Sequence, residues 1–162
     1  MFAVNGRPAG DLSKDTQATV AITGPDSYDL FVVTGIVQIE EIWGEVITAI
    51  DLDTTGASLQ ILPDGGPAVP ITNPGGVDIS SLAVGSFLGK TCDASIPLAA
   101  ADSLGANIAE SIYGNTTSFK VIEGDGLDTT IQMVTGGTGN SGRIRWHARW
   151  TPLSEDGTIS PA

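Results

Sequence analysis

The residue types that carry most enzyme and metal chemistry are sparse in this 162-residue chain. It holds one histidine, His147, and one cysteine, Cys92. A single imidazole cannot build the histidine cluster that holds a transition metal, and a single thiol cannot close an intramolecular disulfide. A Ser-His-Asp triad with a nucleophile elbow would place its serine in a Gly-x-Ser-x-Gly turn, and no serine of this sequence has those neighbours. We therefore expect no enzyme activity.

Acidic residues are plentiful, but none of their patterns defines a site. The segment 51–56 is similar to the start of a calcium loop, yet Leu62 stands where such a loop needs a bidentate glutamate. We interpret this segment and the Gly-Asp-Gly stretch at 124–126 as turns. A carboxylate pair for glycoside hydrolysis is an open alternative, because the sequence singles out no pair. We expect no metal and no cofactor.

The most informative pattern is a stretch of alternating basic and apolar residues at 143–150. Successive side chains of a strand point to opposite faces, so this stretch predicts one apolar and one basic face. The apolar face, which carries two large tryptophans and must be core, holds Ile144, Trp146, Ala148 and Trp150. The basic face, a candidate surface for docking a partner, holds Arg143, Arg145, His147 and Arg149.

The basic face has three interpretations. It can pair with carboxylates such as Glu40 and Glu41 on a neighbouring strand, which would stabilise the sheet without any partner. It can also dock onto an acidic patch of another subunit. Binding of nucleic acid is the third interpretation, but a formal net charge of −12 and the lack of a basic groove oppose it. We expect no nucleic-acid partner.

The first strong strand signal lies at 28–41, which is rich in β-branched residues and contains no proline. Its first half is apolar on both faces, so we expect it to be covered on both sides, by a second sheet and by another subunit. Gly35 marks a bulge or a bend. The candidate core residues of this segment are Leu30, Phe31, Val32 and Val33.

The remaining elements are short and separated by turns. The segment 77–88 is ambiguous: it can form one helical turn through Leu82, and it is expected to be extended from Gly85 onward. The segment 94–109 is expected to be irregular, with a short helix at 99–104 as an alternative. A short edge strand is expected at 69–72, because Pro70 cannot donate to a central ladder. Further strands are expected at 42–50, 57–62, 119–122, 129–134 and 142–151.

Many short strands between Gly, Pro and Asp turns indicate an all-β fold, a β-sandwich or jelly-roll-like single domain. We place this domain at 17–162. Residues 1–16 are polar and predict a flexible, extended N-terminal arm. No run of 18 apolar residues and no basic region followed by an apolar stretch is present, so we expect no membrane span and no secretory signal.

Three segments carry a further signal. They are the Leu-Phe-Val-Val-Thr-Gly stretch at 30–35, the segment 78–88 that begins Asp-Ile-Ser-Ser-Leu-Ala-Val-Gly, and the strand 142–154 that begins Gly-Arg-Ile-Arg-Trp and ends Pro-Leu-Ser. In this order they resemble a family of small proteins encoded among the structural genes of tailed bacteriophages and prophages. The third segment is the most distinctive, and the resemblance spans residues 28–157.

This resemblance implies a virion structural protein, in particular a capsid decoration (cement) protein. Such a protein would be made in the host cytoplasm, assemble as a homo-oligomer such as a trimer, and bind the major capsid protein on the outer capsid surface. The alternative is a tail or baseplate component, or a receptor- or glycan-binding module of the virion. Exposed aromatic side chains would be its signature, and Tyr28, Trp43 and Tyr113 are the candidates.

Overall fold

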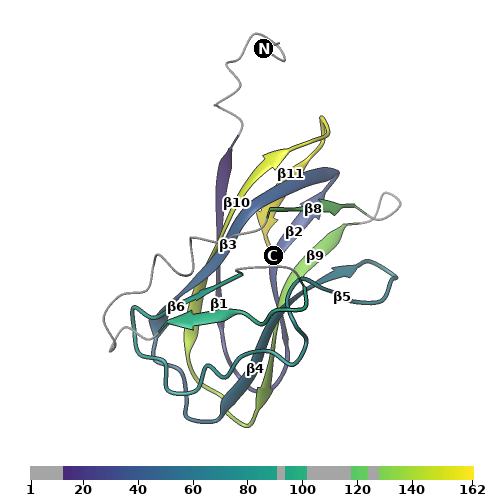
Figure 1. The fold of residues 1–162 in the computed structure, drawn as a ribbon. Coiled ribbons are helices and arrows are strands. Elements are labelled where there is room, and N and C mark those ends of the chain that lie inside the picture. Colours follow the sequence, from purple (N-terminus) through teal and green to yellow (C-terminus); the bar gives the residue numbers. More distant parts are fainter. Residues whose placement is uncertain (1–12, 91–93, 102–117, 124–127) are drawn as a thin grey trace.

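The computed structural model of this chain describes residues 13–90, 94–101, 118–123 and 128–162. Within these ranges every regular element is a β-strand (Figure 1). The strands are β1 (Lys14–Ala21), β2 (Ser27–Thr34), β3 (Ile36–Thr48), β4 (Thr54–Pro63), β5 (Val69–Pro70), β6 (Phe87–Gly89), β7 (Ala99–Ala101), β8 (Phe119–Ile122), β9 (Thr129–Gly137), β10 (Arg143–Pro152) and β11 (Thr158–Pro161).

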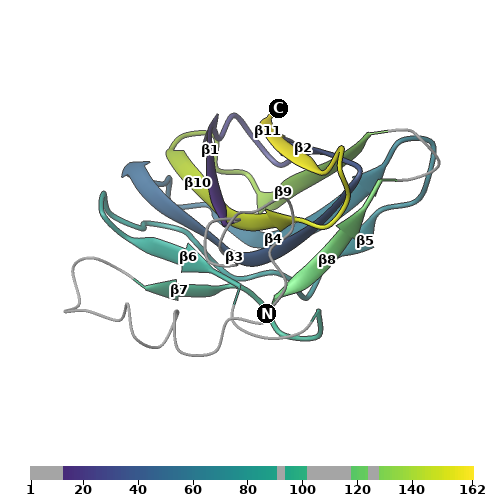
Figure 2. The same cartoon turned by 90° about the horizontal axis from the view of Figure 1, so that it is seen from above.

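The strands form two antiparallel sheets that pack face to face, as Figures 1 and 2 show. The first, named sheet A, has the order β1-β10-β3-β6-β7, and β8 pairs with β3 beside this path. The second, sheet B, has the order β11-β2-β9-β4-β5. The fold is therefore a β-sandwich, as the sequence predicts. The strand β5 lies at the edge of its sheet, where proline is tolerated.

The chain passes from sheet B to sheet A at Gly35. β2 pairs with β9, whereas β3, which begins one residue later, pairs with β10. Gly35 has a φ of 66°, a conformation that favours glycine. A Cβ atom at this position would lie 2.6 Å from Ser154 Oγ and from Asp156 Oδ1. The segment predicted as one strand at 28–41 is therefore two strands in different sheets, and β3 continues unbroken into the segment predicted as a separate strand.

The core lies between the two sheets and includes most of the predicted core residues. Leu30 and Phe31 are both fully buried, although they are neighbours in one strand. A register shift between Asp29 and Phe31 explains this, because such a bulge breaks the alternation of faces. Val32 differs from the expectation: it is half-buried and lines a hollow on the outer surface of sheet B. The other predicted core residues, Val33, Ile144, Trp146 and Trp150, are buried.

The predicted arm at 1–16 overlaps the first strand. Residues 14–16 belong to β1, which pairs along its whole length with β10, from Lys14 opposite Trp150 to Ala21 opposite Arg143. β1 is held at the edge of sheet A because its inward face is buried or half-buried against the core. Residues 1–12 lie outside the described ranges.

The two segments with helical alternatives have other structures. The segment 78–82 contains one turn, at Ser80 and Ser81, which is anchored where Ser81 N donates to Asp51 O at 3.2 Å. Residues 99–101 form strand β7, and residues 102–104 lie outside the described part of the chain, as do Cys92, Tyr113 and the predicted turn at 124–126. The described residues include no helix long and apolar enough to cross a membrane.

Candidate docking surface on sheet A

The basic residues of β10 share the outer face of sheet A. β10 lies between β1 and β3, so each of these residues has neighbours on both sides. Arg143 and Arg149 are exposed and Arg145 is half-buried, but His147 is only 9% exposed. The four predicted docking residues therefore share one face and differ sharply in access. His147 is packed within this face, whereas the three arginines are more accessible, and the docking role of the four residues stays a prediction.

Two of the three arginines are paired with carboxylates on β3. The Nε atom of Arg149 lies 3.3 Å from a carboxylate oxygen of Glu40, and its Nη2 atom lies 3.3 Å from one of Glu41. The Nη1 atom of Arg145 lies 3.8 Å from a carboxylate oxygen of Glu45. This is the cross-strand pairing that the sequence offered as one interpretation of the basic face.

An aromatic stack occupies the centre of the same face. The indole of Trp43 on β3 lies parallel to the imidazole of His147, with ring centroids 3.9 Å apart and planes 3° apart. The ring of Phe87 on β6 meets Trp43 at a centroid distance of 5.6 Å and an angle of 51°. Such pairs contribute about 0.5–1.5 kcal/mol beyond the area they bury. The stack therefore holds β10, β3 and β6 together on the outer side of the sheet.

Burial under Trp43 determines the protonation of His147. Desolvation lowers the pKa of His147 below its ordinary value of 6.5, while the carboxylates of Asp15 and Glu45 act in the opposite direction and Arg145 adds to the lowering. The Nδ1 atom lies 3.9 Å from an Asp15 carboxylate oxygen. The Nε2 atom is buried without a hydrogen-bond partner among the described residues. The site therefore favours the neutral imidazole.

Sequence reasoning found part of this surface. The period-two pattern of 143–150 identified the residues of β10, and Trp43 was among the candidate exposed aromatics. Phe87 and Asp15 were missed, since β6 has only three residues and β1 has few apolar ones. Tyr28, another aromatic candidate, is half-buried, and its hydroxyl donates to Gly24 O at 2.5 Å.

The surface combines cross-strand ion pairs with an aromatic stack. Among the described residues no group of three or more His, Cys, Asp or Glu side chains is arranged to hold a metal ion. The fold and this surface define the molecule as an antiparallel β-sandwich with a charged and aromatic outer sheet face. No protein-family model, no curated protein and no solved structure matches this chain significantly.

Proposed function

We propose that this protein is a structural protein of a bacteriophage virion, a capsid decoration protein that binds the outer shell. In this role it would contact the major capsid protein and assemble as a homo-oligomer. The resemblance of its three sequence segments to phage structural proteins supports the proposal. The structural observation that carries it is the exposure of large apolar side chains at both ends of the sandwich.

At one end, Leu52 is 73% exposed and Val84 is 59% exposed. Both lie close to the last residues of β3, because Leu52 follows that strand and Gly85 N donates to Val46 O at 2.8 Å. At the other end, Ile122 is 63% exposed and Leu153 is 47% exposed.

The two ends are separated by the length of β3. A strand of 13 residues spans roughly 40 Å at about 3.3 Å per residue. Grouped apolar side chains on a surface are typical of sites of protein contact. A stiff two-sheet body with such groups at both ends is suited to bridging two neighbours in a shell.

Co-sedimentation tests this proposal directly. The purified chain is mixed with empty shells and, separately, with tails of a phage whose particle contains it. We expect binding to shells and a higher rupture temperature of decorated shells in a thermal scan. Binding to tails alone, or equal rupture temperatures with and without the protein, would contradict the proposal.

One observation favours a second candidate, a glycan-binding module of the tail or baseplate. Trp43 and Phe87 lie on an outer sheet face, where aromatic rings can stack on ligands. A titration with host-surface oligosaccharides, followed by tryptophan fluorescence, separates the two functions. A saturable change in the natural chain that is absent from Trp43→Phe would support glycan binding. An unchanged fluorescence spectrum of the natural chain would favour capsid decoration over glycan binding.

A further inference from the structure

The end of the sandwich where β2 passes into β3, termed the Gly35 end, exposes an apolar row on sheet A. Ile36 and Ile122 are register partners on β3 and β8, so their side chains point to the same face. That face is the outer one, because the next register pair, Val37 and Val121, is buried and therefore points to the core. Leu153 lies on the other side of Ile36, where its N–H donates to Ile36 O at 2.8 Å.

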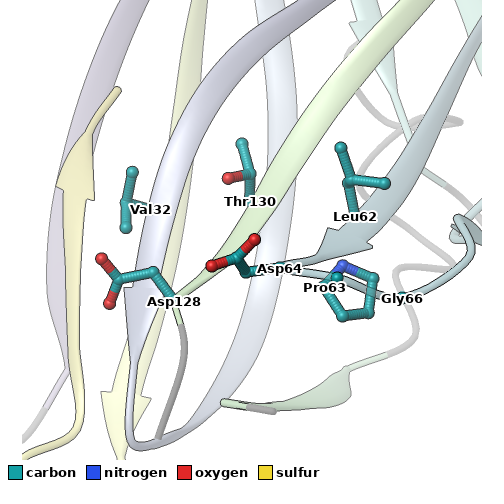
Figure 3. A pocket seen from close by; sticks show the side chains of 8 residues that line it. Val32, Leu62, Pro63, Asp64, Gly66, Asp128 and Thr130 are labelled. Atoms are coloured by element: carbon teal, nitrogen blue, oxygen red, sulfur yellow. The ribbon is translucent and has the colours of Figure 1, made fainter.

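A hollow of about 330 Å³ lies on sheet B at the same end. Val32, Thr130 and Leu62 are register partners across β2, β9 and β4 and line it. Figure 3 shows the carboxylates of Asp64 and Asp128 beside these side chains. The hollow therefore combines apolar walls with two acidic groups.

Further carboxylates surround the Gly35 end. Glu123 accepts a hydrogen bond from Gly35 N, and Asp128 accepts one from Thr34 Oγ1 at 3.1 Å. Asp156 lies so close that a Cβ atom on Gly35 would be 2.6 Å from its Oδ1 atom. The ion pairs between described residues involve none of these carboxylates. The apolar row and the hollow therefore share a negative rim.

We propose that the Gly35 end is the docking surface for a basic face of a partner protein. A lysine or arginine side chain would enter the hollow, with its methylene stem against Val32 and Leu62 and its charged head at Asp64 and Asp128. Long cationic side chains pack in this way, with the stem on apolar surface and the head at polar groups.

Charge complementarity selects this occupant. A second copy of this chain has one basic face, on β10, but Arg145 and Arg149 of that face are already paired with carboxylates of β3. The copy as a whole carries a net charge of −12, so its other faces would be repelled by the negative rim. A basic partner face would be steered toward the negative rim and then cover Ile122 and Leu153. The inference deepens the proposed function, because it names the surface and the chemistry through which a decoration protein would reach its partner.

Calorimetric titration with a defined probe tests the surface. The probe is a lysine-rich peptide with leucine at every third position, and the control peptide has glutamate in place of lysine. We expect the lysine peptide alone to bind. The double variant Asp64→Asn/Asp128→Asn should weaken it about tenfold, as expected for lost charge pairs in a contact. The matched control Asp26→Asn/Asp53→Asn, which removes the same charge elsewhere, should change the affinity less than about twofold.

The apolar row is tested by a double variant of its own and by a matched control. Ile122→Ser/Leu153→Ser should weaken the lysine peptide, whereas Leu52→Ser/Val84→Ser at the opposite end should not. Circular dichroism checks that each variant is folded, and exposed substitutions of this kind typically change stability by no more than about 0.5 kcal/mol. Absent binding, or equal losses in the Gly35-end variants and in their controls, would overturn the inference.

The same variants in shell co-sedimentation separate this inference from the proposed function. If natural chain and Gly35-end variants bind shells equally well, the decoration role stands and the docking surface is overturned. If the peptide shows the expected pattern and shells do not bind even the natural chain, the docking surface stands and the decoration role fails.

Discussion

His147 is the residue whose environment departs most from that of a surface strand. It belongs to the outer face of sheet A, yet Trp43 covers its ring and its Nε2 atom is buried without a partner among the described residues. A protonated ring in this position would carry a buried charge and an unsatisfied N–H donor, and both are costly. Its pKa is lowered chiefly by desolvation. The folded protein therefore binds a proton at His147 less readily than the unfolded chain does.

This gives a pH dependence with a definite sign. Above the ordinary histidine pKa of 6.5, the ring is neutral in both states and makes no pH-dependent contribution. As the pH falls below 6.5, the unfolded chain takes up the proton first, and stability decreases until the folded pKa is passed. Urea unfolding at pH 7.5 and pH 5 should show a larger loss for the natural chain than for His147→Gln. Equal losses would contradict this assignment.

Arg149 differs from Arg143 on the same face, because it lies between Glu40 and Glu41. Arg149→Met leaves two neighbouring carboxylates of β3 without their counter-charge and should reduce the free energy of unfolding by about 0.5–1 kcal/mol. Arg143→Met should change it by less than about 0.5 kcal/mol. Denaturant titrations at low and high salt check this, since the difference should shrink as salt screens the pairs. A difference independent of salt would rule out the ion pairs as its cause.

At the scale of the elements, packing between β3 and β10 depends on one missing side chain. Gly44 is buried opposite Trp146 in the register of the two strands. A Cβ atom on Gly44 would lie 2.8 Å from Ile144 Cγ2 and 3.1 Å from Trp146 Cδ2. The side chains of Ile144 and Trp146 together therefore fill the space that a side chain at 44 would need.

Gly44→Ala should consequently reduce the free energy of unfolding by about 1–3 kcal/mol, the usual cost of overpacking a core. Gly136→Ala in β9 is the matched control, because the nearest atom to its added Cβ lies at an ordinary 3.5 Å, and we expect a change within about 0.5 kcal/mol. Thermal unfolding followed by circular dichroism compares them. If both variants melted alike, the close packing at Gly44 would not be limiting.

The elements with strong patterns could be predicted from the sequence, and the faint ones could not. The alternation in 143–150 gave both faces of β10, since two tryptophans fix which face is inside. β1 was missed because its inward residues are Thr16, Ala18 and Val20, a weak apolar signal. Gly35 was recognised as a bend, but the change of sheet depends on Ser154 and Asp156, which are distant in sequence.

The candidate docking surface on sheet A could also be predicted only in part. Residues of one strand could be placed on a common face from their spacing, which is a local property. Glu40 and Glu41 were offered from the sequence as partners of that face, and Arg149 pairs with both. The neighbours Asp15 and Phe87 could not be placed, because they lie on strands that are distant in sequence from 143–150. The burial of His147 depends on Trp43, and no pattern within 143–150 reports that neighbour.

At the scale of the whole molecule, β1 closes the seam between the two sheets. Thr16 Oγ1 accepts a hydrogen bond from Trp150 Nε1 at 3.0 Å and donates to Ile159 O at 3.3 Å. It thus connects β10 of sheet A with β11 of sheet B, and Figure 2 shows β1 and β11 at this side of the sandwich. Without β1, β10 would become an open edge, and Trp150 would lose the contacts that Lys14 and Thr16 make with its ring. An open edge strand promotes aggregation.

Two truncations test the role of β1. A chain that begins at Lys14 retains the complete β1–β10 ladder and should unfold cooperatively as a monomer. A chain that begins at Ile22 loses it and should lose most of the about 5–15 kcal/mol that stabilises a typical domain. Size-exclusion chromatography and thermal melting compare the two. A monomeric, cooperatively melting chain from Ile22 would show that β1 is dispensable.

The antiparallel pairing of β1 with β10 also governs how the molecule would respond to mechanical load. Ladder hydrogen bonds lie perpendicular to the strands, and β1 is paired from Lys14 to Ala21. Tension applied to the chain ahead of Lys14, along the strand axis, would strain all of these bonds in shear at once. Tension across the sheet would instead break them one after another, so the strand resists pulling lengthwise far better than peeling.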